Sequence, residues 1–327
     1  MRIVLFGDGR WAADTLQRLS SDGHDVAAVV VRARASDSLL ENAATAMRIP
    51  VQRPAGVNAP AFVTSLAALA PDLGVSVSYD QILRRAVLDV PRYGMMNLHA
   101  GKLPQYRGRN VINWAIINGE EEIGLTAHVV DEGIDTGPIL KQITLPISWA
   151  DGYGDVLAHV VAALPGLAAD TVREIAAGTA TPVPQRAQDG TYFAGRGNGD
   201  EWLDWSASSR NLYNKVRAIS RPGPGALTLL DGHRIVVWRA RYDPSWPCYI
   251  ATPGQVVGRV VGDEGGALVK TGDSTLLVQE VQITGAPSTP PRWRIGTRLG
   301  NDLGTALLTA LDRVATLERR LLKEELA

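Results

Sequence analysis

The 327-residue chain is long enough for two domains with full hydrophobic cores, and its 45% apolar and 20% charged residues are ordinary for a soluble globular protein. The net charge of −1 argues against a partner held mainly through a phosphate backbone, because such proteins usually carry a basic face. The single cysteine, Cys248, excludes an internal disulfide framework and a cysteine-rich metal site, and it fits a reducing compartment.

Neither a membrane-spanning segment nor a signal peptide is expected. No apolar run reaches the ~18 residues that a spanning helix needs. The N-terminal stretch before Gly7 is too short for a signal peptide and instead predicts a buried strand. We therefore expect a cytoplasmic protein without membrane contact.

The N-terminal half predicts a Rossmann-like α/β domain. The first strand leads through Gly7-Asp8-Gly9 into a helix that ends at about Ser20, and a second strand covers residues 26–31. The turn is a poor dinucleotide-binding fingerprint, because its last glycine is missing and no acidic residue stands clearly after the second strand. It is either a plain tight turn or a place where Gly9 and Arg10 border a substrate phosphate, since helix N-termini favour anions.

Apolar periodicity predicts the rest of this domain around a mixed sheet. Strands are expected over residues 73–78, 94–99, 124–130 and 138–145, and helices over 39–47, 61–69, 110–118 and 151–177. Residues 178–199 are rich in glycine, proline, threonine and glutamine and are typical of a linker. We place the first domain at residues 1–178 and the linker at 179–203.

The C-terminal half predicts a small β-barrel over residues 204–300. Five short strands, at residues 226–230, 234–239, 254–261, 267–271 and 276–281, are separated by glycine turns. Residues 301–327 predict a terminal amphipathic helix, with an apolar stripe that includes Leu311, Val314 and Leu317. This stripe must be buried, either on its own chain or in the seam of a homodimer.

Three side chains between residues 97 and 137 could act together on one carbonyl group. Asn97 and His99 are two apart after an apolar run, so a strand would point both to one side at its carboxyl end, where open α/β sheets bind ligands. Asp135 lies in a glycine-bounded loop after a second apolar strand. Taken singly, each residue fits a structural role; only the joint pattern favours chemistry.

The stretch Asn97-Leu98-His99-Ala100-Gly101-Lys102-Leu103-Pro104-Gln105-Tyr106-Arg107-Gly108, followed by Asp135-Thr136-Gly137, resembles the signature of the folate-dependent formyltransferases. That family combines Asn-x-His, a Leu-Pro-x-aromatic-Arg-Gly loop and Asp-Thr-Gly at this separation. The resemblance reappears at residues 217–226 and covers most of the chain. It implies a Rossmann-like catalytic domain, an OB-like C-terminal barrel and N10-formyltetrahydrofolate as co-substrate.

The resemblance also implies which residues hold the folate. The loop after strand 73–78 and the loop around Asp135 would grip the pterin, mostly through main-chain groups. The expected residues are Tyr79, Asp80, Ile82, Leu83, Val130 and Ile134. Without the resemblance, Ile82 and Leu83 are interpreted as core residues of a short helix.

Residue chemistry suggests a role for each member of the trio. His99 suits removal of a proton from an attacking amine, since its unperturbed pKa lies near ~6.5. Asn97 could donate a hydrogen bond to the oxyanion of the tetrahedral carbon. Asp135 could hold the imidazole, raise its proton affinity or bind a relaying water. We interpret the remaining candidates, His128, His159 and His233, as structural, and their spacing supports no metal site.

The loop over residues 102–110 carries three cations. It is either a solvated loop or a clamp for an anionic substrate or the folate glutamate, since arginine forks pair with carboxylate or phosphate. Arg107 could instead brace the loop internally. The candidate substrate contacts are Gly9, Arg10, Lys102, Tyr106, Arg107, Arg109 and Asn110.

The acceptor amine is the least determined feature. Methionyl-tRNA formyltransferases in this family carry a long basic insertion after the second strand, whereas residues 31–41 here are short and contain no lysine. We therefore expect a small-molecule acceptor, a nucleotide-linked amino sugar, as in the sugar-nucleotide N-formyltransferases. The alternatives are methionyl-tRNA, another amine such as hydroxyornithine, and a non-catalytic nucleic-acid-binding module that uses the barrel.

Overall fold

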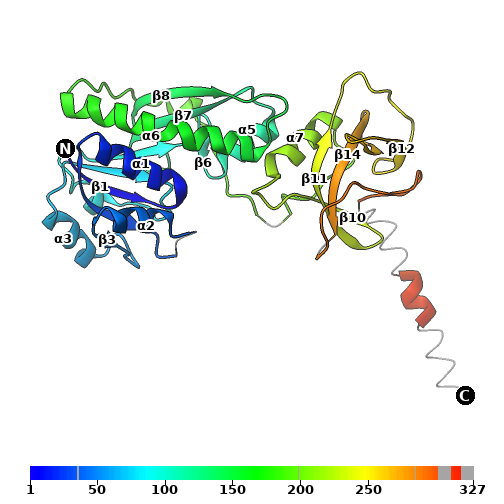
Figure 1. Ribbon diagram of the computed structural model, residues 1–327, viewed down its shortest axis with the longest axis horizontal. Coiled ribbons are helices and arrows are strands. Elements are labelled where there is room, and N and C mark those ends of the chain that lie inside the picture. Colours follow the sequence, from blue (N-terminus) through cyan, green and yellow to red (C-terminus); the bar gives the residue numbers. More distant parts are fainter. Residues whose placement is uncertain (35–36, 198, 284, 301–310, 318–327) are drawn as a thin grey trace, which may run out of the picture. The chain divides into compact units, whose positions relative to one another are not determined.

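The computed structural model describes residues 1–34, 37–197, 199–283, 285–300 and 311–317. The chain divides into two compact units, Met1–Gly197 and Asn198–Ala327 (Figure 1). Residues 179–197, which the sequence analysis assigned to a linker, belong to the first unit.

The first unit is built on a seven-stranded mixed sheet with the order β3-β2-β1-β4-β5-β7-β8. Five strands are parallel: β1 (Arg2–Gly7), β2 (Asp25–Val31), β3 (Val51–Gln52), β4 (Leu73–Val77) and β5 (Met95–His99). The last two, β7 (Glu122–Val129) and β8 (Ile139–Pro146), run antiparallel to their neighbours. The predicted mixed α/β sheet is confirmed.

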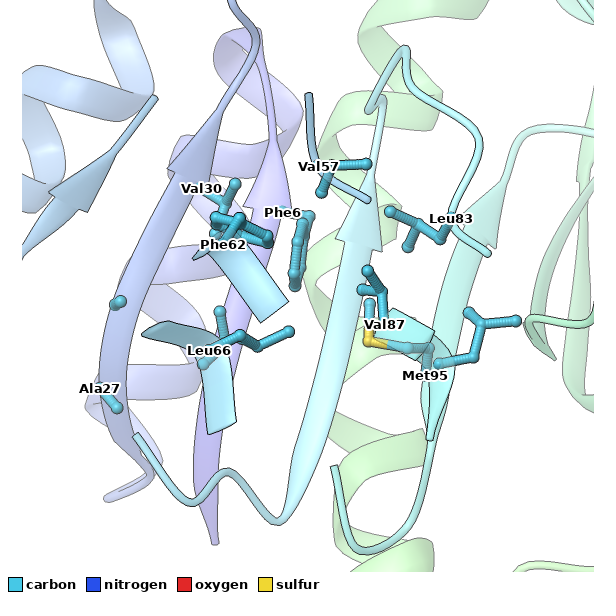
Figure 2. Close-up of a cluster of buried hydrophobic side chains, with 12 residues drawn as sticks. Phe6, Ala27, Val30, Val57, Phe62, Leu66, Leu83, Val87 and Met95 are labelled. Carbon is cyan, nitrogen blue, oxygen red and sulfur yellow. The ribbon is translucent and has the colours of Figure 1, made fainter. Parts of the chain in front are cut away.

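Helices cover both faces of this sheet. Side chains alternate along β1, so Val4 and Phe6 face a buried cluster that also receives Phe62 of α3 (Pro60–Ala68) and Val87 of α4 (Arg85–Leu88) (Figure 2). On the other face α1 (Gly9–Ser21) packs against the long α6 (Tyr153–Ala177). The remaining helices are α2 (Leu39–Ala46) and α5 (Val111–Asn118).

Helix α6 has the length and hydropathy of a membrane-spanning helix, with a mean hydropathy of 1.4 over its most apolar window. Its stripe of Val156, Val160, Leu164, Leu167 and Val172 is buried within the first unit. The helix contacts α1, α5, β7 and β8. Its apolar character is therefore explained by packing over the sheet.

The second unit carries one antiparallel sheet of five strands with the order β10-β11-β14-β13-β12. These are β10 (Ala226–Leu230), β11 (His233–Arg241), β12 (Val256–Val260), β13 (Gly266–Lys270) and β14 (Thr275–Ile283), so the five predicted strands are confirmed. Helix α7 (Ser209–Ile219) packs against β10, β11 and β14, and the Ser208 side chain caps it by accepting from the Asn211 amide at 3.2 Å.

The predicted terminal helix is described only at residues 311–317, which are helical. Leu311, Val314 and Leu317 are each at least half exposed there. Residues 301–310 and 318–327 lie outside the described residues, so the burial of the stripe and the homodimer remain predictions.

Candidate active site

The carboxyl end of β5 and the adjoining end of β7 bring three polar side chains together. Asn97 and His99 lie two apart on β5, as predicted, among the buried Met95, Met96 and Leu98. Strand β7 runs antiparallel beside β5, with His128 directly opposite Asn97. Asn97 Nδ2 lies 3.3 Å from His128 Nε2.

Asp135 reaches this group from the loop between β7 and β8. Its Oδ2 lies 3.6 Å from His99 Nδ1, and its Oδ1 lies 3.5 Å from His128 Nε2. The Gly108 amide donates to Oδ2 at 2.9 Å. One carboxylate therefore sits between two imidazoles, and the structure brings the predicted trio together.

His128 is the residue that sequence analysis missed. From the sequence we interpret it as structural, because it has no ligand-like neighbours along the chain. Its neighbours are instead set by the register between β5 and β7 and by the return of the following loop. The signal available in the sequence was its position, seven residues before Asp135 on the strand expected to lead into the Asp135 loop.

The hydrogen bonds of His99 determine which of its nitrogens could act as a base. Nε2 lies 2.6 Å from the Tyr106 carbonyl oxygen, which can only accept, so Nε2 carries a hydrogen. In the neutral ring Nδ1 is then unprotonated and faces Asp135. Burial lowers the pKa of His99, and the Asp135 carboxylate and the Tyr106 carbonyl oppose that change only in part. His99 is therefore a neutral base whose protonated form would face a carboxylate.

Asp135 is held as an anion. Burial alone would raise its pKa, but hydrogen bonding from His128, the positive charge that His99 carries in the acid range where Asp135 titrates, and the Gly108 amide outweigh burial and lower the pKa to about 2. The carboxylate thus stays ionised across the range in which His99 titrates. It can stabilise the imidazolium that forms when His99 accepts a proton.

The loop that carries Asp135 has an unusual backbone. Asp135 is left-handed, with φ of 53°. Thr136 Oγ1 and the Gly133 amide both donate to Asp131 Oδ1, at 2.6 and 3.1 Å, and tighten the loop. A Cβ on Gly137 would lie 1.8 Å from the Val129 carbonyl oxygen, so only glycine allows the chain to return this close to β7.

Arg107 braces the loop internally, the alternative to its predicted substrate contact. Its side chain is 2% exposed, and Nε and Nη2 donate to Gln185 Oε1 at 3.1 and 2.7 Å. Nη1 donates to the Tyr192 hydroxyl at 3.0 Å. A guanidinium committed in this way cannot clamp a substrate, and the geometry contradicts that role for Arg107.

The other loop residues remain accessible. Lys102 pairs with Glu122, and the Tyr106 hydroxyl donates to Glu120 at 2.6 Å. These four side chains line a small hollow beside the loop. Arg109 and Asn110 are also exposed. A substrate contact by Lys102, Tyr106, Arg109 or Asn110 stays a prediction.

The geometry gives no support to a phosphate site at Gly9 and Arg10. Arg10 Nε is paired with Asp14 at 2.7 Å. The buried Asp8, at the N-terminus of α1, lies 3.2 Å from Arg32 Nη1, and its carboxylate would repel a phosphate there. The ion pair is not apparent from the sequence, because Arg32 and Asp8 follow different strands.

The predicted folate residues fall into two groups. Leu83 belongs to the buried cluster of Figure 2, and Tyr79 and Val130 are packed against that cluster, whereas Asp80, Ile82 and Ile134 are exposed. Ile82 and Leu83 lie in a loop before α4, so the short-helix interpretation is wrong.

Several features of the loops after β4 and β7 suit the binding of a flat heteroaromatic ring. Ile82 and Ile134 are 67% and 55% exposed, so they could pack against such a ring. The Tyr79 hydroxyl is buried and makes no hydrogen bond to the described residues, so a ligand heteroatom would give it a partner. Within those residues no group of three or more His, Cys, Asp or Glu side chains is placed to hold a metal ion.

A neutral buried imidazole, a carboxylate beside its basic nitrogen and a nearby amide suit transfer of an acyl-type group to an amine. The imidazole takes the proton, the carboxylate stabilises the imidazolium, and an amide donor can stabilise an oxyanion. The α/β fold and this site define a group-transfer enzyme.

Comparison with known proteins identifies the family. Residues 1–163 match the family described as Formyl transferase, and residues 198–294 match Formyl transferase, C-terminal domain. The methionyl-tRNA formyltransferase of Pelobacter propionicus is 35% identical over 292 residues, covering 86% of this chain and 89% of the relative. That of Moorella thermoacetica is 36% identical, covering 89% and 94%. The chain belongs to the formyl transferase family.

Solved structures show the same fold at lower identity. WlaRD, a sugar 3N-formyl transferase crystallised with dTDP and 5-N-formyl-THF, has a TM-score of 0.66 and 17% identity, covering 88% of this chain and 99% of that one. An N-formyltransferase from Helicobacter canadensis, in complex with folinic acid and dTDP-3-aminofucose, has a TM-score of 0.64 and 18% identity, covering 84% and 98%. Identities this low establish the fold alone.

Proposed function

We propose that this protein transfers the formyl group of N10-formyltetrahydrofolate to the amine of methionyl-tRNA. The observation that carries the proposal is the 35% identity to a methionyl-tRNA formyltransferase over 86% of this chain, a stretch long enough to include parts of both units. From the sequence alone we expect a nucleotide-linked amino sugar as acceptor, with methionyl-tRNA as an alternative. The relatives favour the alternative.

The folate would lie against the loops that follow β4 and β7. Tyr79, Leu83 and Val130 supply the inner wall, and the exposed Ile82 and Ile134 supply apolar contact for the pterin. Asp80, exposed at the same loop, would contribute mainly through its main chain. The bound folate supplies the formyl carbonyl that the amine attacks.

The residues of the chain then carry the proton and the charge. His99 Nδ1 accepts the proton of the attacking amine, and Asp135 stabilises the resulting imidazolium from 3.6 Å. Asn97 uses its amide to stabilise the oxyanion, and its contact with His128 fixes the amide plane. The new carbon–nitrogen bond forms first, as the carbonyl electron pair moves onto oxygen to give the oxyanion. When the oxyanion collapses, the bond to the folate nitrogen breaks, and His99 can return the proton to that leaving nitrogen.

The test is a direct comparison of acceptors. Purified protein is supplied with N10-formyltetrahydrofolate and either methionyl-tRNA or a panel of nucleotide-linked amino sugars, and kcat/KM is measured for each. We expect methionyl-tRNA to be preferred by on the order of 10²-fold or more, since a mismatched acceptor loses both binding and orientation. Preference for an amino sugar would refute the proposal.

One observation keeps the nucleotide-linked amino sugar as a second candidate. A tRNA acceptor requires cations for its phosphates, yet the net charge is −1. In the segment after β2, Arg32 is already used, because its Nε donates to the Ser78 carbonyl at 2.9 Å and its Nη1 pairs with Asp8. The comparison of acceptors decides between the two candidates.

A further inference from the structure

Residues 183–196, here called the strap, follow the predicted end of the first domain yet cross its catalytic loops. The strap residues Tyr192–Phe193 form β9, which pairs with β6 (Arg107–Gly108). The Arg107 and Arg109 amides donate to strap carbonyls at 3.0 and 2.9 Å. The Phe193 ring stacks on Tyr106, with centroids 4.8 Å apart.

Gln185 makes the contacts of the strap that lie nearest to the chemistry. Its Nε2 donates to the main-chain carbonyls of Asp135 and Gly137, at 2.9 and 2.6 Å. Its Oε1 accepts from two nitrogens of Arg107. Both hydrogens of the carboxamide therefore bind the Asp135 loop, and its oxygen binds the buried Arg107.

We propose that Gln185 is a positioning residue that holds the catalytic carboxylate of Asp135 against His99 and His128. The inference rests on the proposed role of Asp135. It concerns a residue outside the catalytic trio, fifty positions further along the chain.

The backbone of Asp135 explains why such a clamp is needed. A left-handed residue other than glycine is strained, and it persists only when surrounding contacts fix it. The Gly108 amide holds the Asp135 carboxylate, and Gln185 holds the carbonyls on either side of Thr136. Without Gln185 the peptide groups of the loop could rotate, and the carboxylate would move away from His99.

Arg107 joins the two supports of this loop. Its buried side chain binds Gln185, and its own residue lies directly before Gly108, whose amide holds Asp135. The Tyr192 hydroxyl, also on the strap, is the further acceptor for the guanidinium. The Tyr192 hydroxyl bonds Arg107 and, among the described residues, has no hydrogen bond to the Asp135 loop, which makes Tyr192 a matched control.

The test uses Gln185→Glu, Gln185→Met and Tyr192→Phe in the full-length protein. Gln185→Glu keeps an acceptor for Arg107 but cannot donate to the two carbonyls, and Gln185→Met removes all three bonds. We expect both to lower kcat by on the order of 10²-fold with KM for the formyl donor changed less than about threefold, because misplacement affects the reacting geometry rather than donor binding. Tyr192→Phe should keep kcat within about twofold.

A second readout does not depend on turnover. The pKa of His99, followed by NMR of labelled histidine and assigned with His99→Asn, should fall in both Gln185 variants, because Asp135 raises it in the wild-type protein. If methionyl-tRNA proves not to be the acceptor, the expected titration of His99 is unchanged. The inference is overturned if both variants keep the wild-type titration, or if Tyr192→Phe matches their loss. Circular dichroism identifies a variant that has not folded, and the other variant then decides.

Discussion

His99 has two ring nitrogens with separate tasks. The Tyr106 carbonyl fixes the hydrogen on Nε2, so Nδ1 is left as the unprotonated nitrogen beside Asp135, which is the nitrogen that we propose as the base. Burial keeps the ring neutral by lowering its pKa, while Asp135 stays charged with a pKa of about 2. These opposite preferences, set by burial and by hydrogen bonds, keep the acceptor and its counter-charge in the states that proton removal requires.

Removing the base should abolish most of the catalysis. We expect His99→Asn to lower kcat by roughly 10²–10⁴ without loss of the fold, since a positioned base supplies about that much. In the wild-type protein kcat should decline in acid with a midpoint below 6.5, because the protonated ring cannot accept another proton. Steady-state rates across pH give both results; a midpoint above 6.5 would contradict the assignment.

Asp135 should also influence stability, with a definite sign. Its folded pKa of about 2 lies below the ordinary 3.8, so its contribution is present above pH 3.8 and is lost as pH falls through about 2. The shift corresponds to about 2 kcal/mol. We expect the difference in unfolding free energy between wild type and Asp135→Asn, from urea denaturation, to shrink over that range. A constant difference would show that the carboxylate is not stabilised in its ionised form.

At the scale of elements, the site is assembled where β5 and β7 lie side by side and the loop after β7 turns back. Gly137 allows that return, since any Cβ would meet the Val129 carbonyl. The strap then covers the loop from the other end of the domain sequence. The loop after β5, the loop after β7 and the strap therefore set the geometry of Asn97, His99 and Asp135.

Gly137→Ala should test this close approach. We expect a loss of about 1–3 kcal/mol in unfolding free energy, as for other overpacked sites, together with reduced kcat. Gly166→Ala is the matched control, because it lies inside α6 with no heavy atom within 4 Å of the added Cβ. That change should stabilise by about 0.5–1 kcal/mol through helix propensity. Equal destabilisation by both would argue against a specific contact at Gly137.

The sequence predicted those features of the fold and site that depend on a single continuous segment. Strand and helix periodicity predicted the strands of the seven-stranded and five-stranded sheets other than the two-residue β3, and the spacing of Asn97 and His99 predicted their common side. His128, Arg32 and Gln185 were not predicted, because each acquires its partner from a distant segment through sheet register or loop return. The strap was expected as a linker since its short polar composition has no periodicity that would reveal β9.

At the scale of the whole molecule, both units match formyl transferase domains, and a chain with net charge −1 is proposed to act on a polyanion. The cytoplasmic location and the homodimer built on the terminal helix remain predictions. So do the boundaries of 1–178, 179–203, 204–300 and 301–327. The 33 basic residues are balanced by 34 acidic ones, so we expect only a few phosphate contacts.

Turnover on methionyl-tRNA should therefore depend only moderately on salt. For about two phosphate contacts, we expect kcat/KM to fall about tenfold between about 50 and about 200 mM salt. Rates at several salt concentrations, compared with those on a neutral amine, measure this dependence. A fall of a thousandfold would indicate a concentrated basic face that the net charge conceals, and no fall would favour an uncharged acceptor.

The pairing of β9 with β6 has a consequence for biosynthesis. The carboxylate, both imidazoles and the amide are all translated by residue 135, yet the segment that clamps them is completed only at residue 196. A nascent polypeptide that has emerged only as far as β8 would hold every proposed catalytic group and lack the proposed clamp. Catalytic activity would then arise late during translation, after Gln185, Tyr192 and Phe193 have emerged from the ribosome.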